Sequence, residues 1–457
     1  MTQGSGPTNV RKKSEICAGM STDTIYAVSS GTGRAAIAVV RLSGTATRAI
    51  VKSIVRRLPP PRTAILATLR DPATQADIDS GLVLFFPAPR SFTGEDCAEF
   101  HIHGGRAVVA GLLGALGGID GVRAAEPGEF TRRALLNSKL DLAQVEGIGD
   151  LIEAETEWQR RQAMRQMQGG LSRQTAQWRS ALLEASALVE AEIDFSDEGD
   201  VPEALSRRVS GVVRPVHDAL RAELAAAKSS ERIREGVVIV ISGPPNAGKS
   251  TLLNALARRD AAIVSHEAGT TRDAIEVQLD LAGYAVTLID TAGLRESADM
   301  VEQIGVARAL EKAQNADLVL WLSEADGPAA PDERLGAAEV WRIFTKADLV
   351  VNKDAERGLF ISAETGENLD LLLDRLTQRA AQLSGEGHAG LITRERHRKA
   401  FAAAVDALAR IDADPQAPIE FLAEDLRAAL FALERLIGRV DVEDILGDIF
   451  SRFCIGK

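Results

Sequence analysis

The chain has 457 residues, of which 45% are hydrophobic and 26% are charged, and its formal net charge is −12. This composition is typical of a globular protein of about two to four domains. The acidic balance excludes a basic surface for nucleic acid spread over the whole molecule, although it leaves room for a local basic patch. Three cysteines exclude a disulfide-rich scaffold and favour a reducing, cytoplasmic location, and no apolar run reaches membrane-spanning length.

The N-terminal part of the chain combines strand, turn and helix signals. Residues 1–21 are polar and are expected to form a disordered extension. Strand-like runs at 23–28 and 35–42 flank a glycine-containing turn, and similar signals alternate to about residue 127. The sequence therefore predicts an N-terminal α/β domain over residues 22–138.

Helical patterning dominates two later parts of the chain. Glycine becomes sparse, and apolar positions recur at helical spacing, as at Trp178 and Leu182. A βαβ pattern separates the two helical parts. We therefore predict a nucleotide-binding domain at 235–384 inserted into one helical domain, which is formed by residues 139–234 and 385–457.

A phosphate-binding loop opens the predicted inserted domain. Residues 243–250 read GPPNAGKS and match the pattern G-x-x-x-x-G-K-[ST]. An apolar strand pattern precedes them and a helical pattern follows, so the loop N–H groups and the helix N-terminus favour an anion. Lys249 is expected to reach the β- and γ-phosphates, and the Ser250 hydroxyl is expected to bind Mg²⁺.

Four further motifs follow in the order that a GTPase requires. GTTRD at 269–273 supplies a switch threonine, and DTAG at 290–293 offers a carboxylate to the metal and an N–H to the γ-phosphate. TKAD at 345–348 ends in a carboxylate that can accept from guanine N1–H and the exocyclic amine, a donor pair that adenine lacks. SAE at 362–364 is expected to support the base. The alternative is a degenerate domain that binds no nucleotide.

Two residues bear on the hydrolytic mechanism. Leu294 follows the DTAG motif, where Ras-type enzymes have a glutamine that orients the attacking water. Another group must therefore do this. Asn246 lies inside the phosphate loop, where its side-chain oxygen can bind a monovalent cation and so neutralise transition-state charge. Asparagine is also common in turns, which is the alternative explanation for Asn246.

The nucleotide motifs, together with segments at both ends of the chain, resemble the bacterial tRNA-modification GTPase family MnmE (TrmE). The resemblance extends from about residue 23 to the last residue. The segments that carry it are DTI (23–25) with RLSG (41–44), SFTGED (91–96) with HGG (103–105), PGEFT (127–131) with NSKLD (137–141), and the terminal FCIGK (453–457).

The resemblance implies a multidomain α/β fold. It has an N-terminal folate-binding and dimerisation domain, an all-α domain made of two segments, and an inserted P-loop GTPase domain of the Ras-like type. It also implies K⁺-dependent GTP hydrolysis coupled to addition of a carboxymethylaminomethyl-type group at C5 of the tRNA wobble uridine. The implied one-carbon donor is 5-formyl- or methylene-tetrahydrofolate. The implied partners are tRNA, a second copy of the chain in a homodimer, and the flavoprotein MnmG, with which the chain is expected to form a heterotetramer. No association with a membrane is expected.

The resemblance also implies roles for individual residues. Glu302 is expected to position the attacking water through a second water. Mg²⁺ is expected to bind Ser250 and Thr271, and K⁺ is expected to bind Asn246, Ser265, Glu267 and Thr270. Combined with the motifs, the expected GTP-binding set is Asn246, Ala247, Gly248, Lys249, Ser250, Thr251, Ser265, Thr270, Thr271, Asp290, Thr291, Ala292, Gly293, Thr345, Lys346, Asp348, Ser362, Ala363 and Glu364.

The implied folate site lies outside the GTPase domain. Its residues are Arg41, Glu95, Lys139 and the terminal Lys457, whose charges suit the glutamate tail and the pterin N–H groups of a folate. Without the resemblance, Glu95 is a loop residue, and Arg41 and Lys139 are surface charges. Cys454 is an implied catalytic residue because a neighbouring cation favours the thiolate, whereas an ordinary buried thiol is the alternative.

Three positions depart from the family pattern. Pro244 occupies a loop position that often has arginine, and Glu267 adds a charge to the loop expected to enclose K⁺. Thr345 replaces the usual asparagine of the base-recognition motif, and GTP preference is expected to persist because Asp348 selects the base. Two functional alternatives remain, namely a ribosome-assembly or signalling GTPase without modification chemistry, and a scaffold with an inactive nucleotide site.

Overall fold

The computed structural model describes residues 23–31, 33–194, 202–259, 262–263, 276–290, 314–324, 339–351, 353–354, 356–387, 390–413, 417–439, 446–447, 449–450, 453 and 456. The chain forms two compact units. One contains residues 1–145 and 441–457, and the other contains residues 146–440. The described part of 441–457 thus groups with the N-terminal unit rather than with the helical segment to which the sequence assigned it.

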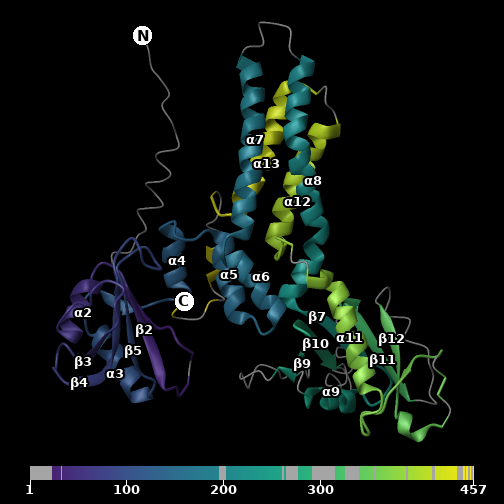
Figure 1. Ribbon diagram of the computed structural model, residues 1–457, viewed down its shortest axis with the longest axis horizontal. Coiled ribbons are helices and arrows are strands. Elements are labelled where there is room, and N and C mark those ends of the chain that lie inside the picture. Colours follow the sequence, from purple (N-terminus) through teal and green to yellow (C-terminus); the bar gives the residue numbers. More distant parts are fainter. Residues whose placement is uncertain are drawn as a thin grey trace, which may run out of the picture. The chain divides into compact units, whose positions relative to one another are not determined.

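The N-terminal unit is built on a six-stranded sheet (Figure 1). The strand order is β3-β4-β5-β2-β1-β6, and every pair is antiparallel except the parallel pair β1–β6. The strands are β1 (Thr24–Val28), β2 (Ile37–Ser43), β3 (Ile65–Arg70), β4 (Asp77–Phe86), β5 (Cys97–His103) and β6 (Val122–Ala124). The helices are α2 (Thr47–Val55), α3 (Arg106–Gly117), α4 (Glu129–Leu136) and the start of α5 (Leu142–Glu153).

Alternation along β2 divides this sheet into a buried and an open face. Val40 and Leu42 are fully buried and belong to a core cluster with residues of α2 and α3. Arg41 lies between them and points to the opposite face, because successive side chains of a strand alternate. The sheet therefore presents Arg41 on the face that the core cluster does not occupy.

The end of the chain packs on the start of α4 and on β1. A side chain at Gly128 would approach Phe450 and Phe453 to 2.7 and 3.0 Å, so glycine permits this contact. Gly128 has a φ of 67° and immediately precedes α4, a conformation that glycine adopts at little cost. The Ser29 hydroxyl donates to the Gly456 carbonyl over 2.9 Å. Phe450, Phe453 and Gly456, which belong to the described residues, thus contact the start of α4 and the end of β1.

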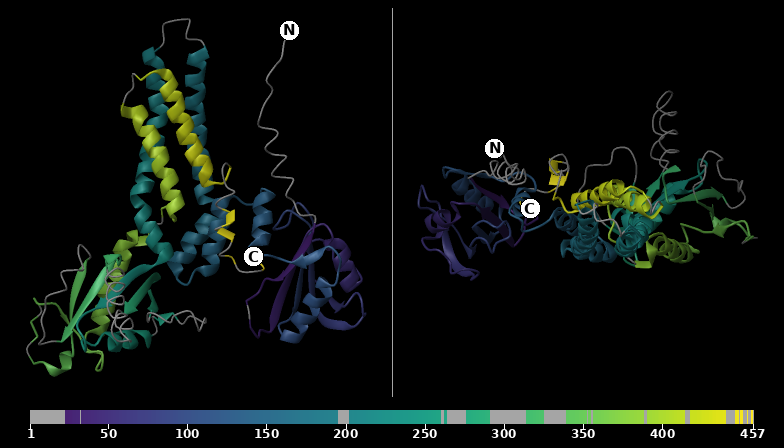
Figure 2. Two further views of the ribbon diagram at one scale, coloured as in Figure 1. Left: turned by 180° about the vertical axis from the view of Figure 1, so that it is seen from behind. Right: turned by 90° about the horizontal axis from the view of Figure 1, so that it is seen from above.

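The second unit contains a bundle of long helices, which Figures 1 and 2 show from several sides. Trp178 meets Phe401 edge to face, with ring centroids 5.6 Å apart, and fully buried leucines such as Leu182 and Leu408 fill the interior. The predicted helical spacing therefore corresponds to buried positions. The helices of this part are the remainder of α5, then α6 (Glu157–Met167), α7 (Gly170–Asp194), α8 (Pro202–Glu235), α12 (Glu395–Ala413) and α13 (Ile419–Leu436).

A seven-stranded sheet with the order β13-β12-β11-β7-β10-β9-β8 interrupts this bundle in sequence. It is parallel except for β9 and β8, which pair antiparallel to their neighbours. Its strands are β7 (Val237–Ser242), β8 (Ala262–Ile263), β9 (Glu276–Leu281), β10 (Tyr284–Asp290), β11 (Leu318–Glu324), β12 (Val340–Thr345) and β13 (Leu359–Phe360). The helical segments are α9 (Lys249–Ala257), η4 (Ala347–Leu349), α11 (Leu369–Leu383) and η5 (Gly385–Gly387).

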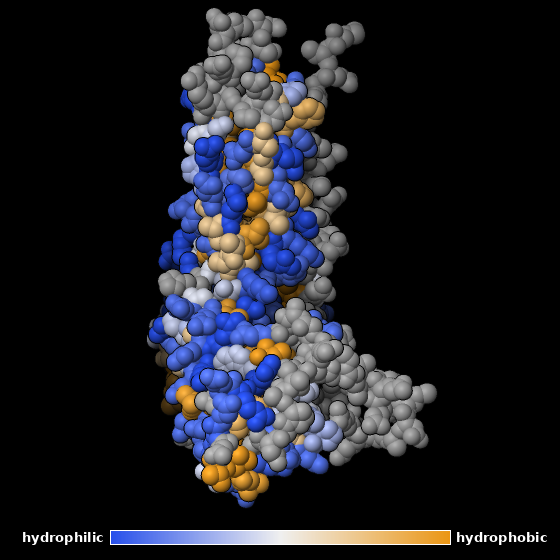
Figure 3. Space-filling model, turned by 90° about the vertical axis from the view of Figure 1, so that its right-hand side faces the viewer, coloured by the Kyte–Doolittle hydropathy of each residue, from blue (hydrophilic) through white to orange (hydrophobic). Residues whose placement is uncertain are grey.

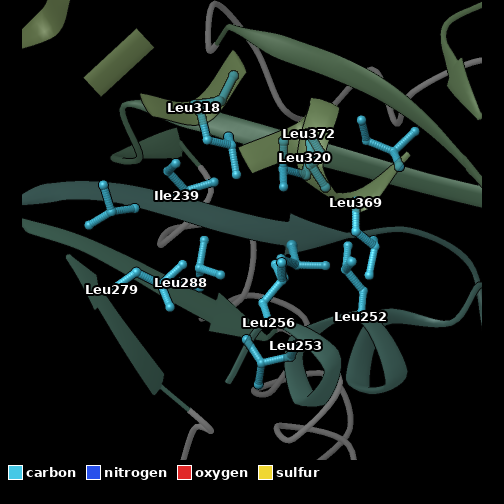
Figure 4. Packing of buried hydrophobic residues seen from close by; sticks show 14 of the residues in the cluster. Ile239, Leu252, Leu253, Leu256, Leu279, Leu288, Leu318, Leu320, Leu369 and Leu372 are labelled. Carbon is cyan, nitrogen blue, oxygen red and sulfur yellow. The ribbon is translucent and has the colours of Figure 1, made fainter. Parts of the chain in front are cut away.

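The core of the inserted domain explains the apolar character of its central strands. Ile239, Leu288 and Leu320 come from three adjacent strands and pack with Leu252 and Leu372 of the two helices (Figure 4). Because β7 lies inside a parallel sheet, nearly all of its residues are apolar. This packing fixes the carboxyl ends of the strands, where the nucleotide motifs lie.

The chain enters and leaves the inserted domain at one place. Arg234 Nε donates to the Thr393 carbonyl over 2.8 Å, and the Gly390 N–H donates to Ser230 Oγ over 2.8 Å. Nearby, Trp158 of α6 stacks on Tyr284 of β10, with centroids 5.7 Å apart. The inserted domain is therefore joined to the helices by hydrogen bonds and by aromatic packing.

Within the described residues, no helix combines the length and apolarity needed to cross a membrane. On the face of the molecule drawn in Figure 3, hydrophilic side chains surround separate apolar areas.

Candidate functional site

The phosphate loop connects β7 to α9 and depends on unusual backbone angles. Gly243 has a φ of 149°, and a Cβ atom there would lie 2.1 Å from the Leu322 carbonyl oxygen. Asn246 and Gly248 have φ values of 65° and 82°. These left-handed positions favour glycine and asparagine. The fixed glycines of the motif thus have a direct steric cause.

Lys249 lies folded into the loop. Its side chain is largely buried, and Nζ donates to the carbonyls of Gly243 (3.0 Å) and Pro244 (2.8 Å). The ammonium is therefore held beside the loop backbone. A phosphate group bound by the loop would lie within reach of this charge and of the first N–H groups of α9.

Ser250 and Asp290 come together from α9 and from the end of β10. The Ser250 hydroxyl donates to Asp290 Oδ2 over 2.7 Å, and Asp290 is fully buried. A hydroxyl next to a carboxylate fits Mg²⁺, which prefers hard oxygen ligands and usually keeps phosphates and waters as its other ligands. The two residues would hold the ion, and the bound ion would supply positive charge beside the phosphates.

Thr345 connects the end of β12 to the end of β11 and to the phosphate loop. Its hydroxyl lies 2.9 Å from the Ala247 carbonyl oxygen and 3.2 Å from the Ser323 carbonyl oxygen, and its one hydrogen can be donated to either. Thr345, one of the three departures from the family pattern, therefore supports the phosphate loop from the end of β12. The threonine hydroxyl thus contacts the backbone of the phosphate loop.

Asp348 presents an exposed carboxylate at the base-recognition position. A hydrogen bond from Ser362, followed by one from its own backbone, lowers the pKa of Asp348 below its ordinary value. Ser362 is buried, and its Oγ also accepts from the Thr365 N–H over 3.2 Å. Asp348 is thus kept ionised and oriented as an acceptor.

The remaining predicted nucleotide residues occupy different situations. Thr251 lies exposed in the first turn of α9, and Lys346 forms an ion pair with Glu324. Ala363 and Glu364 lie in the turn after β13. Several predicted residues are outside the described part of the chain, namely Ser265, Glu267, Thr270, Thr271, Thr291, Ala292, Gly293, Glu302, Cys454 and Lys457.

A cationic cavity lies on the N-terminal unit. Its volume is about 460 Å³, and it is lined by Arg41, Arg62, Phe86, Arg90, Ser91, Phe92, Cys97, Glu99 and Lys139. Arg41 donates to Glu99 Oε1 over 3.0 Å and lies 5.3 Å from the ring centroid of Phe92. Lys139 donates to the Pro89 carbonyl over 3.1 Å. Two of the three described residues of the predicted folate site therefore line one cavity.

Glu95 lies beside this cavity but is not among its lining residues. It accepts from Ser43 Oγ over 2.7 Å and from Arg133 Nη1 over 3.2 Å. Sequence reasoning also missed Arg62 and Arg90, since Arg62 lies far from every motif that carries the resemblance. Arg90 immediately precedes the SFTGED segment, and this position next to a motif could have indicated that Arg90 lies near the predicted folate site.

Arg133 also contacts Glu129, a buried carboxylate in the first turn of α4. Burial by itself would raise the pKa of Glu129. Hydrogen bonds from Arg123, the Glu126 N–H and Arg133 outweigh burial and lower the pKa from 4.5 to about 2. The folded state therefore favours the ionised carboxylate, and its contribution to stability is fully present above about pH 4.5 and disappears as the pH falls towards 2.

We expect acid to loosen the N-terminal unit through Glu129. The lowered pKa corresponds to about 3 kcal/mol that is lost between about pH 4.5 and 2. In Glu129→Gln this component is absent, and α4 should exchange its amide hydrogens faster at neutral pH. Hydrogen–deuterium exchange of peptides covering α4 measures both effects. Glu126→Gln, at an exposed ion pair with Arg132, is the control and should behave like wild type. Equal exchange in the two variants would contradict this assignment.

Comparison with known proteins identifies relatives of both units. Residues 24–139 match the family described as GTP-binding protein TrmE N-terminus, and residues 142–454 match the family described as MnmE helical domain. A protein of Beijerinckia indica named tRNA modification GTPase MnmE is 62% identical over 435 residues, covering 95% of this chain and 96% of that protein. Proteins of the same name from Rhodopseudomonas palustris and Bradyrhizobium sp. are each 52% identical and cover 96% and 95% of this chain and 99% of their own lengths. The chain therefore belongs to the MnmE family of tRNA modification GTPases.

Proposed function

We propose that this chain hydrolyses GTP as one step of tRNA modification at the wobble uridine. The observation that carries the GTPase part is the convergence of Lys249, the Ser250–Asp290 pair and Asp348 on one edge of the sheet. Phosphoryl transfer requires positioned positive charge around the phosphates more than covalent participation by the protein. Lys249 and the first turn of α9 supply such charge, and Ser250 and Asp290 provide oxygen ligands for Mg²⁺.

The proposed hydrolysis depends on K⁺ and on contact between two GTPase domains. Asn246 lies in the phosphate loop and has a left-handed backbone conformation. We assign the K⁺ site to Asn246 with Ser265, Glu267 and Thr270, the second Mg²⁺ contact to Thr271, and the positioning of water to Glu302. The support for these roles is the family to which the chain belongs together with the matching residue types.

A tetrahydrofolate is the proposed one-carbon donor, as its 5-formyl or methylene derivative. The cavity lined by Arg41 and Lys139 also contains Arg62 and Arg90, and such a set favours the carboxylates of a folate tail. The ring of Phe92 offers an apolar surface to a pterin. Glu95 contributes in this proposal from beside the cavity, while Lys457 and the catalytic Cys454 belong to the C-terminal segment.

The proposed partners are tRNA, a second copy of the chain and the flavoprotein MnmG. Apolar side chains on the open face of the N-terminal sheet support a homodimer. Ile37, Leu66 and Leu82 are 61%, 65% and 43% exposed, and Leu66 and Leu82 face each other across β3 and β4. A second copy of the chain that covers this exposed apolar surface would remove it from water, which is favourable.

Nucleoside analysis of tRNA tests the whole proposal. A strain that lacks this gene should lose the modified wobble uridine, and the intact gene should restore it. Cys454→Ser should fail to restore it while GTP hydrolysis persists. If loss of the gene leaves the tRNA nucleosides unchanged and the protein does not bind 5-formyltetrahydrofolate, the chain is instead a GTPase switch without modification chemistry.

The monovalent cation is a separate prediction. Hydrolysis should be at least about tenfold faster in K⁺ than in Na⁺, because a bound cation neutralises charge that develops in the transition state. Asn246→Ala should remove this difference. Phosphate release at constant ionic strength measures the rates, and equal rates in both salts would contradict a K⁺ site.

Base selection should depend on Asp348. Asp348→Asn keeps one acceptor oxygen but replaces the other with an NH2 donor, so it cannot accept from both the guanine N1–H and the amine, and affinity for GTP should fall by about 10²-fold or more. Xanthosine triphosphate, which has a carbonyl in place of the amine, should then bind better than GTP because the asparagine amide can donate to it. Competition between the two nucleotides measures the change. Asp354→Asn, at an exposed loop position, serves as the control.

A further inference from the structure

A groove rich in arginine lies on the inserted domain. Its volume is about 510 Å³, and its walls come from β12, from residues 356–359 and from α11. The charged residues that line it are Arg342, Glu356, Arg357, Arg375 and Arg379. Four arginines against one glutamate give a local charge of +3 on a chain whose net charge is −12. The groove is thus a local reversal of the overall charge.

The groove lies away from the nucleotide motifs. β12 ends at Thr345, which contacts the phosphate loop, whereas the groove takes Val340–Ile343 from the beginning of that strand. On α11 it takes residues 375–382 and not the first turn, which begins at Leu369. Its cations are therefore not part of the GTP site.

The backbone and two arginines give the groove a defined shape. A side chain at Gly358, which has a φ of 152°, would lie 2.6 Å from the Arg342 carbonyl, so the chain runs close against β12. Arg357 lies 4.7 Å from the ring centroid of Phe344. Arg379 forms an ion pair with Glu339 and donates to Gln382 over 3.1 Å.

The other two arginines are available for a ligand. Arg342 and Arg375 are both exposed, and neither forms an ion pair with any other residue in the part of the chain that the structure describes. The partly exposed Trp341 also lines the groove; it packs against the apolar core, and its indole N–H donates to Glu339 Oε1 over 3.0 Å. Guanidinium groups bind phosphate oxygens in pairs, and an indole ring can stack on a base.

We propose that this groove binds the phosphate backbone of RNA. The identity of that RNA as tRNA rests on the proposed function. Guanidinium groups in a concave site concentrate positive potential, which attracts a polyanion to an otherwise acidic protein. An acidic peptide would also pair with arginine, but the aromatic lining and the several cations favour a chain that carries both phosphates and bases.

Charge reversal tests the assignment on the full-length protein. In the double variant Arg342→Glu/Arg375→Glu, tRNA affinity near 0.15 M salt should fall by about tenfold or more, and the salt slope should fall by about two, one for each lost phosphate contact. The control is Arg160→Glu/Arg161→Glu, which changes the net charge equally at exposed arginines on α6. Filter binding of a tRNA transcript measures affinity at several salt concentrations.

Separate readouts distinguish the outcomes. Basal GTP hydrolysis should be unchanged in the groove variant, and Arg342→Lys/Arg375→Lys should retain most of the tRNA affinity. If wild type binds tRNA and the groove variant binds it equally well, the groove assignment is wrong while the proposed function stands. If wild type binds no tRNA, both are wrong. If the groove variant loses binding of adenosine monophosphate, which lacks the donor pair that Asp348 is proposed to accept from, but keeps tRNA binding, the groove belongs to a small anion and the assignment is overturned.

Discussion

Replacing Lys249 with alanine is expected to reduce the rate of GTP hydrolysis by about 10²- to 10³-fold. The ammonium lies against the loop carbonyls of Gly243 and Pro244, where a bound phosphate would meet it in a site with little access to water. Removing a preorganised charge from such a site costs far more than removing one from the surface. Phosphate release at saturating GTP measures the loss.

The control for this prediction is Lys228→Ala, which removes an exposed lysine from α8 in the same unit. It should retain the wild-type rate. GTP binding by Lys249→Ala should also weaken, and thermal unfolding without nucleotide checks that the domain is intact. A folded Lys249→Ala protein with a rate within about twofold of wild type would contradict the role of Lys249.

The largest effect on stability is expected at Glu146, in the helical part of the second unit. Its carboxylate is 1% exposed and accepts from Arg396 and from His397 Nε2, the latter over 2.9 Å, while His397 is completely buried. Burial opposes ionisation, but the charges of His397 and Arg396 hold the pKa of Glu146 well below its usual range. Glu146→Gln should destabilise the unit by about 3–5 kcal/mol, because it leaves the partly buried Arg396 guanidinium and the completely buried His397 ring without their carboxylate.

The effect should appear as a lower melting temperature of the helical part, followed by circular dichroism. Glu395→Gln is the matched control, because Glu395 lies at the start of α12 and pairs only with exposed cations in the described part of the chain. It should melt within about a degree of wild type. The stabilising contribution of Glu146 requires the ionised form, so the two variants should converge as the pH falls below about 4.5. Equal melting of both variants at neutral pH would show that the buried ion pair contributes little.

Motifs with fixed local geometry could be predicted from the sequence. The glycines of the phosphate loop are required by φ angles and by the proximity of Leu322, and these constraints act within one short segment. The family was predicted from such segments and is confirmed by relatives that cover nearly the whole chain. GTP hydrolysis is the activity that those relatives are named for.

Contacts between distant segments could not be predicted in the same way. Thr345 was recognised as a departure, but its bonds to Ala247 and Ser323 depend on the order of three strands. Glu95 was assigned from the family resemblance, yet it pairs with Arg133, a residue that no motif singled out. The arginine groove is formed by residues of a strand, a loop and a helix that are far apart in the sequence. Because the chain as a whole is acidic, its composition does not indicate a local positive charge.

The hydrogen bonds between Arg234 and Thr393 and between Ser230 and Gly390 place both connections of the inserted domain next to each other. When a chain leaves a helical bundle and returns to the same point, the domain between these two points can be inserted or removed with little rearrangement of the bundle. The two adjacent junctions therefore meet the geometric requirement for inserting one domain into another without disturbing the host domain. The stacking of Trp158 on Tyr284 adds a contact between the inserted domain and the helices next to these junctions.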